Sequence, residues 1–126
     1  MQRFLAVICG GAIGTGLRYA ITLWANRHGG IFFPYGTIVV NVVGSFCIGL
    51  FMVYFNNRPD ISPVIKLFVI TGILGGLTTF STFNAELLTL IQIPSYGPAL
   101  LYGALNIIAG LFICWIGTIV GQLLYY

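Results

Sequence analysis

The chain has 126 residues, of which 59% are hydrophobic and 6% are charged, and its net charge is +3. A soluble domain carries roughly 25% charged residues, so this composition excludes a protein whose whole surface faces water and favours a lipid environment. The five basic residues are scattered along the sequence and form no patch typical of nucleic-acid binding, so no nucleic-acid partner is expected.

Four apolar segments dominate the sequence, with turn and polar residues between them. They cover residues 4–25, 35–55, 64–93 and 99–124, and each has the ~20 residues that a helix needs to cross ~30 Å of hydrocarbon. Backbone polar groups in lipid must bond within the protein, so we predict an all-α membrane bundle of four helices. We assign residues 1–126 to this single transmembrane domain, with both termini on the same side.

Arg18 is an ionisable residue inside the first predicted span. Such residues are costly in lipid and are therefore candidates for function. Either its long side chain reaches the membrane surface, or it lines a water-filled vestibule and raises the local concentration of anions. The same span contains Gly10 and Gly14, a spacing that lets helix backbones approach closely, either within the bundle or between two copies of it.

Asn41 is a polar residue near the start of the second predicted span. Its amide carries two N–H donors that could bind an anion. The alternative is a hydrogen bond to a neighbouring helix, worth ~0.6 kcal/mol in membranes. The residue type alone leaves both interpretations open.

The third predicted span, residues 64–93, is longer than a membrane requires, because a straight helix of this length would measure about 45 Å. We predict a break near its middle, where Gly75 and Gly76 are followed by Thr78 and Thr79. Either this is a kink whose hydroxyls bond freed backbone groups, or it exposes carbonyls that bind a cation. No carboxylate lies close by in sequence, so neutral oxygens favour Na⁺ over a divalent ion.

Phe80 and Phe83 follow the predicted break and, being three residues apart, share one helix face. They are either apolar bulk or a pair whose electropositive ring edges contact an anion. Ser81 and Thr82 lie between them. Glu86 follows one turn later and either hydrogen-bonds while protonated or titrates with solvent.

Tyr102 and Asn106 are four residues apart in the fourth predicted span and could continue a polar stripe there. His28 is the only histidine of the chain, lies in a predicted loop, and has no nucleophile or metal-ligand cluster around it in sequence. An enzyme is therefore not expected.

The lysines and arginines give only a weak signal for orientation in the membrane. One side receives Arg3, Arg58 and Lys66, and the other receives Arg27, with Arg18 if that residue reaches the surface. Either the chain inserts in one weakly specified orientation, or it inserts in both. The second case allows an antiparallel homodimer from a single chain.

Three stretches, GTGLRY, GTIVVNVVGSFCIG and GGLTTFSTFNAE, make the chain resemble the small fluoride channels of the Fluc/CrcB type. The resemblance covers essentially the whole chain, and the third stretch is the most specific. It implies a dual-topology antiparallel homodimer in the bacterial inner membrane that passively exports fluoride through two pores. The implied partners are the fluoride ion, a second copy of the chain and the lipid bilayer.

The resemblance also implies roles for individual residues. The vestibule charge would come from Arg18, and the backbone carbonyls of Gly75 and Thr78 would hold a structural Na⁺ at the dimer interface as the only cofactor. Nothing is carried over to Asn106 or to other fourth-span residues beyond Tyr102. The fluoride pathway would be lined by Asn41, Thr79, Phe80, Ser81, Thr82, Phe83, Glu86 and Tyr102.

Two rival functions are compatible with the composition. A small multidrug-type proton-coupled exporter would have a similar length and the same number of spans, but such proteins use a carboxylate in the first span, where this chain has Arg18. A membrane subunit that transports nothing would need only the glycine-rich helical bundle.

Overall fold

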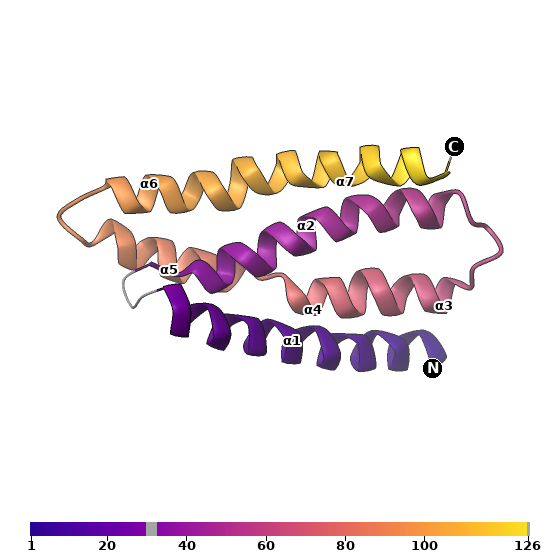
Figure 1. Cartoon of the computed structure of the whole chain (residues 1–126). Coiled ribbons are helices and arrows are strands. Elements are labelled where there is room, and N and C mark those ends of the chain that lie inside the picture. The colour runs from indigo at the N-terminus through magenta and orange to yellow at the C-terminus, as the bar shows by residue number, and fades with distance from the viewer. Residues whose placement is uncertain (30–32, 126) are drawn as a thin grey trace.

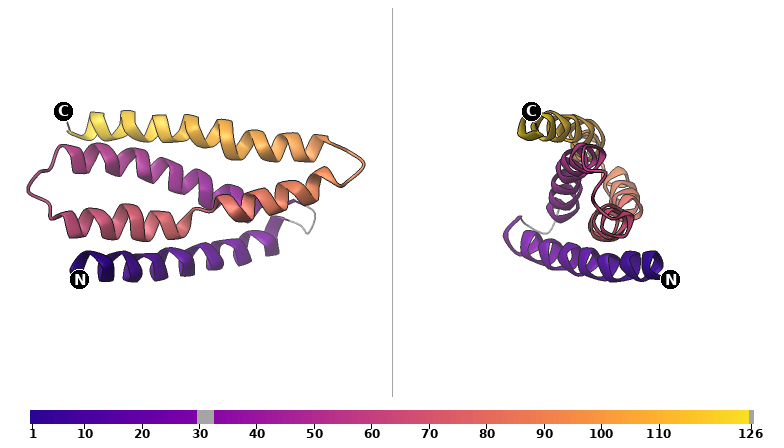
Figure 2. Two further views of the ribbon diagram at one scale, coloured as in Figure 1. Left: turned by 180° about the vertical axis from the view of Figure 1, so that it is seen from behind. Right: turned by 90° about the vertical axis from the view of Figure 1, so that its right-hand side faces the viewer.

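The computed structural model of the chain describes residues 1–29 and 33–125 and consists there of long helices that run alongside one another (Figure 1). Helix α1 (Gln2–Gly29) is the first span, and helix α2 (Tyr35–Asn56) is the second. The end-on view shows α1 lying obliquely to the other helices (Figure 2).

The third and fourth spans are each built from several consecutive helical segments. The third consists of α3 (Pro63–Lys66), the π-helical η1 (Leu67–Leu74), α4 (Gly75–Leu77) and α5 (Phe80–Ile91). The fourth consists of α6 (Gly97–Ala104), the π-helical η2 (Leu105–Ala109) and α7 (Gly110–Tyr125).

In the described part of the chain, four helical segments are long and apolar enough to cross a membrane, at Gln2–Gly29, Tyr35–Asn56, Pro63–Ile91 and Gly97–Leu124. This confirms the predicted number of membrane-spanning helices. The first helix continues beyond the expected end of its span and takes in Arg27 and His28, which we had placed in a loop.

The third span is broken within the predicted stretch, at its two threonines. Gly75 and Gly76 are helical, whereas Thr78 (φ −79°, ψ 155°) and Thr79 (φ −150°, ψ 120°) are extended. The Thr79 hydroxyl then caps α5 by accepting the Thr82 N–H at 3.3 Å. The β-branched threonines suit an extended backbone, and their hydroxyls replace part of the lost helical bonding.

The glycines of the first and third spans serve close packing between those two helices. A Cβ added at Gly10 would lie 2.4 Å from the carbonyl oxygen of Phe68, and one at Gly76 would lie 2.7 Å from that of Gly11. Packing of small residues is what holds helices together in lipid, which offers no hydrophobic drive for association. The spacing of Gly10 and Gly14 could serve packing within the bundle or between two copies. The contacts within one chain are sufficient to explain it.

Helix α2 packs along α7 in the same way. A Cβ at Gly49 would lie 2.1 Å from the carbonyl oxygen of Cys114, and one at Gly117 would lie 2.3 Å from that of Phe46. These contacts hold α2 against the fourth span, and its further contacts with η1 and α4 bring its polar residue Asn41 beside the break.

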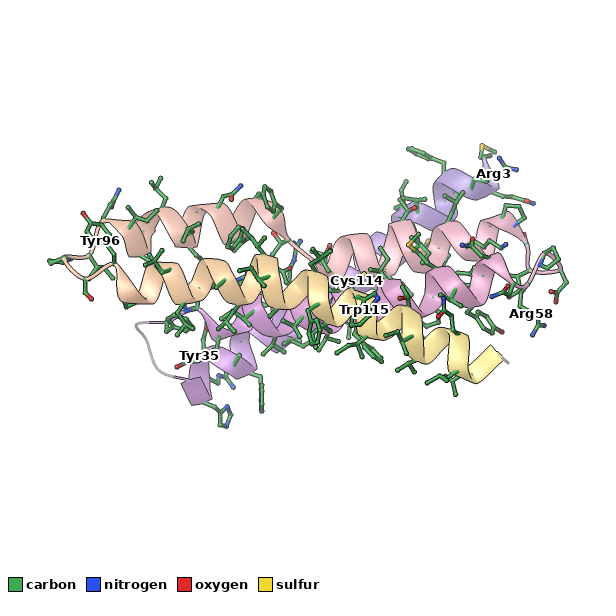
Figure 3. The ribbon with its side chains drawn as sticks, turned by 90° about the horizontal axis from the view of Figure 1, so that it is seen from above. Arg3, Tyr35, Arg58, Tyr96, Cys114 and Trp115 are labelled. Atoms are coloured by element: carbon green, nitrogen blue, oxygen red, sulfur yellow. The ribbon has the colours of Figure 1, made fainter. Side chains whose placement is uncertain are left out.

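Charged residues mark the end of the bundle at which both chain termini lie. Figure 3 shows Arg3 and Arg58 at this end, with Tyr35 and Tyr96 at the other. Arg58 holds Asp60 with a bond of 2.9 Å from Nη2 to Oδ2, and this hydrogen bond lowers the pKa of the Asp60 carboxyl. Lys66 Nζ donates to the carbonyl oxygen of Phe55 at 2.7 Å, close to the end of α2.

Candidate functional site

A cleft of about 300 Å³ lies beside the break in the third span. It is bounded by α2, by both halves of the broken span and by η2. Six of the predicted site residues line it: Asn41, Gly75, Thr78, Thr79, Phe80 and Phe83. The cleft is not lined by the other five: Arg18, Ser81, Thr82, Glu86 and Tyr102.

Asn41 binds both backbone groups of Thr79. Its Oδ1 accepts the Thr79 N–H at 2.8 Å, and its Nδ2 donates to the Thr79 carbonyl oxygen at 3.1 Å. The same Nδ2 donates to Oδ1 of Asn106 at 2.9 Å, and Asn106 Nδ2 donates to the Tyr102 carbonyl oxygen at 3.1 Å. The second and fourth spans are thereby tied to the extended residues of the third.

The direction of every bond in this chain of amides follows from one unambiguous donor. A backbone N–H can only donate, so the Thr79 amide identifies the Asn41 atom facing it as oxygen. The Asn41 nitrogen must then face the Asn106 oxygen, and the Asn106 nitrogen must face the Tyr102 carbonyl. Of the two interpretations of Asn41, the structure has the hydrogen bonds to neighbouring helices: both N–H donors have protein partners, and an ion could reach them only by displacing one.

The two phenylalanines lie in different environments although they share a helix face. The Phe83 ring is 2% exposed and packs 5.5 Å from the Tyr102 ring, measured between centroids, whereas Phe80 is 71% exposed. Their own ring centroids are 5.6 Å apart with an interplanar angle of 45°. The pair therefore runs from the open side of the cleft into the core.

Tyr102 and Glu86 form a side-chain pair behind Phe83. The Tyr102 hydroxyl donates to Oε2 of Glu86, and the Tyr102 side chain is fully buried. Among the hydroxyl residues after the break, Thr79 and Thr82 are joined by a bond of 3.0 Å between their hydroxyl oxygens. Ser81 is exposed and lies away from the cleft.

Arg18 is the predicted vestibule residue, and the structure places it against the break. Its Nη1 donates to the carbonyl oxygen of Thr78 at 3.2 Å, across 60 positions of sequence. The side chain is partly buried and does not line the cleft. Arg18 therefore bonds the broken backbone from the side of α1, whereas Asn41 bonds it from the side of α2.

The carbonyls of Gly75 and Thr78 have the chemistry expected of a site for Na⁺. In an unbroken helix they would accept the N–H groups of Thr79 and Thr82, four residues later. Here the Thr79 N–H donates to Asn41, and the Thr82 N–H donates to the Thr79 hydroxyl. Both carbonyl oxygens are thus freed from helical bonding, and neutral oxygens of this kind suit a hard monovalent cation.

Two further polar residues line the cleft, Ser45 and Asn106. Ser45 lies one turn after Asn41 in α2, so the i, i+4 spacing could have identified it from the sequence. Asn106 is the residue that the same spacing from Tyr102 predicts to continue a polar stripe, although the family resemblance implies nothing for it. Gly44 also lines the cleft, and its lack of a side chain leaves room for Thr78, because a Cβ at this position would lie 2.2 Å from Cγ2 of Thr78.

Comparison with known proteins gives a consistent result over nearly the whole chain. Residues 5–118 match the family model described as CrcB-like protein, Camphor Resistance. The fluoride-specific ion channel FluC of Chloroflexus aurantiacus is 39% identical over 122 residues, 97% of each chain. The FluC of Roseiflexus is 44% identical over 101 residues, 80% of this chain and 82% of that one. The FluC of Aquifex aeolicus is 40% identical over 117 residues, 93% of this chain and 94% of that one.

Proposed function

The chain belongs to the CrcB-like family, and from this membership and the cleft at the helix break we propose that it is a channel specific for fluoride. It is a multi-pass membrane protein of a channel family, which confirms the expectation that it is not an enzyme. The observation that carries the proposal is the concentration of polar groups and aromatic rings around the extended residues Thr78 and Thr79.

The chemistry of these groups suits a small, strongly hydrated anion. Fluoride loses water on entering a narrow path, and N–H and O–H donors must replace that water. Asn41 and the hydroxyls of Thr79 and Thr82 supply such donors when the ion displaces one of their protein partners, and the edges of Phe80 and Phe83 add weak attraction without a fixed charge that would trap the ion. The Tyr102 hydroxyl and Glu86 continue the polar track behind Phe83, and Ser81 extends it on the exposed side.

We further propose that the working unit is an antiparallel, dual-topology homodimer with two pores in the bacterial inner membrane, which lets fluoride leave the cytoplasm passively. Two features support this. The excess of basic residues at one end is small, with Arg3, Arg58 and Lys66 there against Arg27 at the other, and Phe80 is 71% exposed next to an interrupted backbone. Interrupted backbone at membrane depth needs protein or a water-filled cavity to cover it, and a second copy would provide that cover.

The carbonyls of Gly75 and Thr78 are proposed to hold a structural Na⁺ at the interface of the two copies. When bound, such an ion neutralises the partial negative charge of the freed carbonyls. Arg18 is proposed to bring positive charge to the approach of the pore and so to attract anions. Neither the bound Na⁺ nor Arg18 is changed by transport, because fluoride moves down its own gradient.

The rival interpretation as a proton-coupled multidrug exporter gains no support. The chain has two acidic residues. Asp60 is bound to Arg58 in the loop after α2, and Glu86 accepts a hydrogen bond from Tyr102. Neither lies in the first span, where that class of exporter carries its carboxylate.

Efflux from liposomes tests the proposal. Purified protein is reconstituted into vesicles loaded with potassium fluoride, and a potassium ionophore then allows the counter-ion to leave. We expect rapid fluoride release at a fluoride electrode, insensitive to the direction of a Na⁺ gradient. Release of chloride at a similar rate would contradict specificity, and a flux that follows the Na⁺ gradient would indicate coupled transport.

A further inference from the structure

Arg18 reaches the helix break because the preceding turn of α1 packs directly on the third span. A Cβ at Gly14 would lie 2.1 Å from the Ile73 carbonyl oxygen and 2.9 Å from the Leu77 nitrogen. Residues four apart share a helix face, so Arg18 continues the face of Gly14 just where α4 ends. Its Nη1 there donates to the Thr78 carbonyl oxygen at 3.2 Å.

The Arg18 guanidinium donates to a neutral carbonyl oxygen. The two acidic side chains of the chain have other partners. Asp60 is held by Arg58, and Glu86 accepts from Tyr102. The Thr78 carbonyl is free to accept because the backbone is extended there, with ψ at 155°. An arginine inside a membrane span is costly unless its donors are satisfied, and the freed carbonyl satisfies one of them.

We propose that Arg18 is a tethered cation at the break, and that it competes with Na⁺ for the carbonyl of Thr78 and so sets how much Na⁺ the protein requires. This inference rests on the Na⁺ site proposed above. Two positive charges sharing one carbonyl oxygen lie within a few ångströms and repel each other, more strongly in a partly buried site than in water. A carbonyl already bonded to a guanidinium is also a weaker ligand for a second cation.

The test measures Na⁺ binding through stability and does not depend on transport. The thermal midpoint of the purified full-length protein is followed while Na⁺ replaces choline at constant ionic strength, because a ligand that binds only the folded state raises this midpoint. Arg18→Gln keeps an N–H donor for Thr78 but removes the charge. Arg27→Gln is the matched control, since it removes the same charge from the same helix away from the break.

We expect the Na⁺ concentration for half of the stabilisation to fall at least about tenfold in Arg18→Gln, while Arg27→Gln follows the wild type. If Arg18→Gln does not fold, Arg18→Met is used, which keeps an unbranched side chain without the charge; it should shift the half-stabilising Na⁺ concentration in the same direction. Equal half-stabilising concentrations in all proteins would overturn the competition while leaving the Na⁺ site standing.

The absence of any Na⁺ response, in the wild type and in the variants, would overturn both the competition and the Na⁺ site. Neither result bears on fluoride conduction, which the efflux assay measures separately. Normal Na⁺ titrations in a protein that releases no fluoride would contradict the channel function and leave the role of Arg18 intact.

Discussion

Thr79 is the residue whose backbone N–H loses its helical acceptor at the break, and Asn41 replaces that acceptor while also donating to the Thr79 carbonyl, which begins α5. The Asn41 amide matches a peptide group in having one donor side and one acceptor side, so it can face an extended residue as a neighbouring strand would. Its bonds of 2.8 and 3.1 Å to Thr79 and of 2.9 Å to Asn106 join three spans. We therefore assign Asn41 a positioning role in addition to its proposed place on the ion pathway.

Asn41→Asp should destabilise the protein and reduce fluoride efflux. The carboxyl keeps an acceptor for the Thr79 N–H but turns an oxygen toward the Thr79 carbonyl and the Asn106 oxygen. Losing a partner for buried polar groups costs about 1–3 kcal/mol. Thermal unfolding in detergent and the electrode assay measure the two effects. The same change at Asn84, which is exposed on α5, is the control, and equal behaviour of the two variants would contradict the role of Asn41.

Phe80→Ile and Phe83→Ile should both reduce fluoride efflux, by about tenfold or more, because isoleucine has no electropositive ring edge. Only Phe83→Ile should also destabilise the protein, by about 1–3 kcal/mol, since its ring is buried against Tyr102. Comparing efflux with the thermal midpoint separates the two effects. Fluoride flux at the wild-type rate from both variants would contradict a role for the two ring edges in conduction.

At the scale of helices, α1 and the first half of the third span pack backbone to backbone through glycines. The predicted pair Gly10 and Gly14 faces the third span, with Gly72 and Gly76 opposite. A Cβ at Gly72 would lie 2.8 Å from the Cα of Gly10. This contact positions α4 and therefore the point at which the helix stops.

Gly14→Ala should destabilise the bundle by about 1–3 kcal/mol, because the new methyl group would overlap the Ile73 carbonyl oxygen and force the helices apart. Gly16→Ala is the matched control. A Cβ there has nothing within 4 Å, and alanine is the better helix former by about 1 kcal/mol. Thermal midpoints of the two variants give the comparison, and a stable Gly14→Ala protein would show that this contact does not hold the helices.

Sequence patterns predict the helices and the existence of the break better than its location. Apolar length revealed four spans and showed that the third was too long. The break is predicted within the stretch from Gly75 to Thr79, and of these residues the threonines are extended while Gly76 stays helical and packs closely on α1. The bond from Arg18 to Thr78 spans 60 positions, and that from Asn41 to Thr79 spans 38. Such pairs depend on how whole helices pack, which single-chain periodicity does not encode.

At the scale of the whole molecule, the distribution of charge bears on how the chain inserts. Arg3 and Arg58 lie at the end that holds both termini (Figure 3), and Lys66 lies there too, bonded to the Phe55 carbonyl, while Arg27 belongs to the far end of α1. So small a difference supports insertion in both orientations, and hence the proposed antiparallel dimer.

Fixing the orientation should abolish function in each variant alone. Adding three lysines after Tyr126 would strengthen the charge at the end with the termini. Gln92→Lys with Ser95→Lys would strengthen the opposite end, where both residues are exposed. Cells lacking their own fluoride exporter should resist fluoride only when the two variants are produced together, as a growth assay would show. Full resistance from either variant alone would contradict the antiparallel dimer.

Anion selectivity in reconstituted vesicles tests the central claim most directly. Vesicles loaded with equal fluoride and chloride, and containing only this protein, are followed with electrodes for both ions after addition of a potassium ionophore. The account predicts that fluoride leaves rapidly while chloride stays inside. Retention of both ions, or their release at comparable rates, would contradict it.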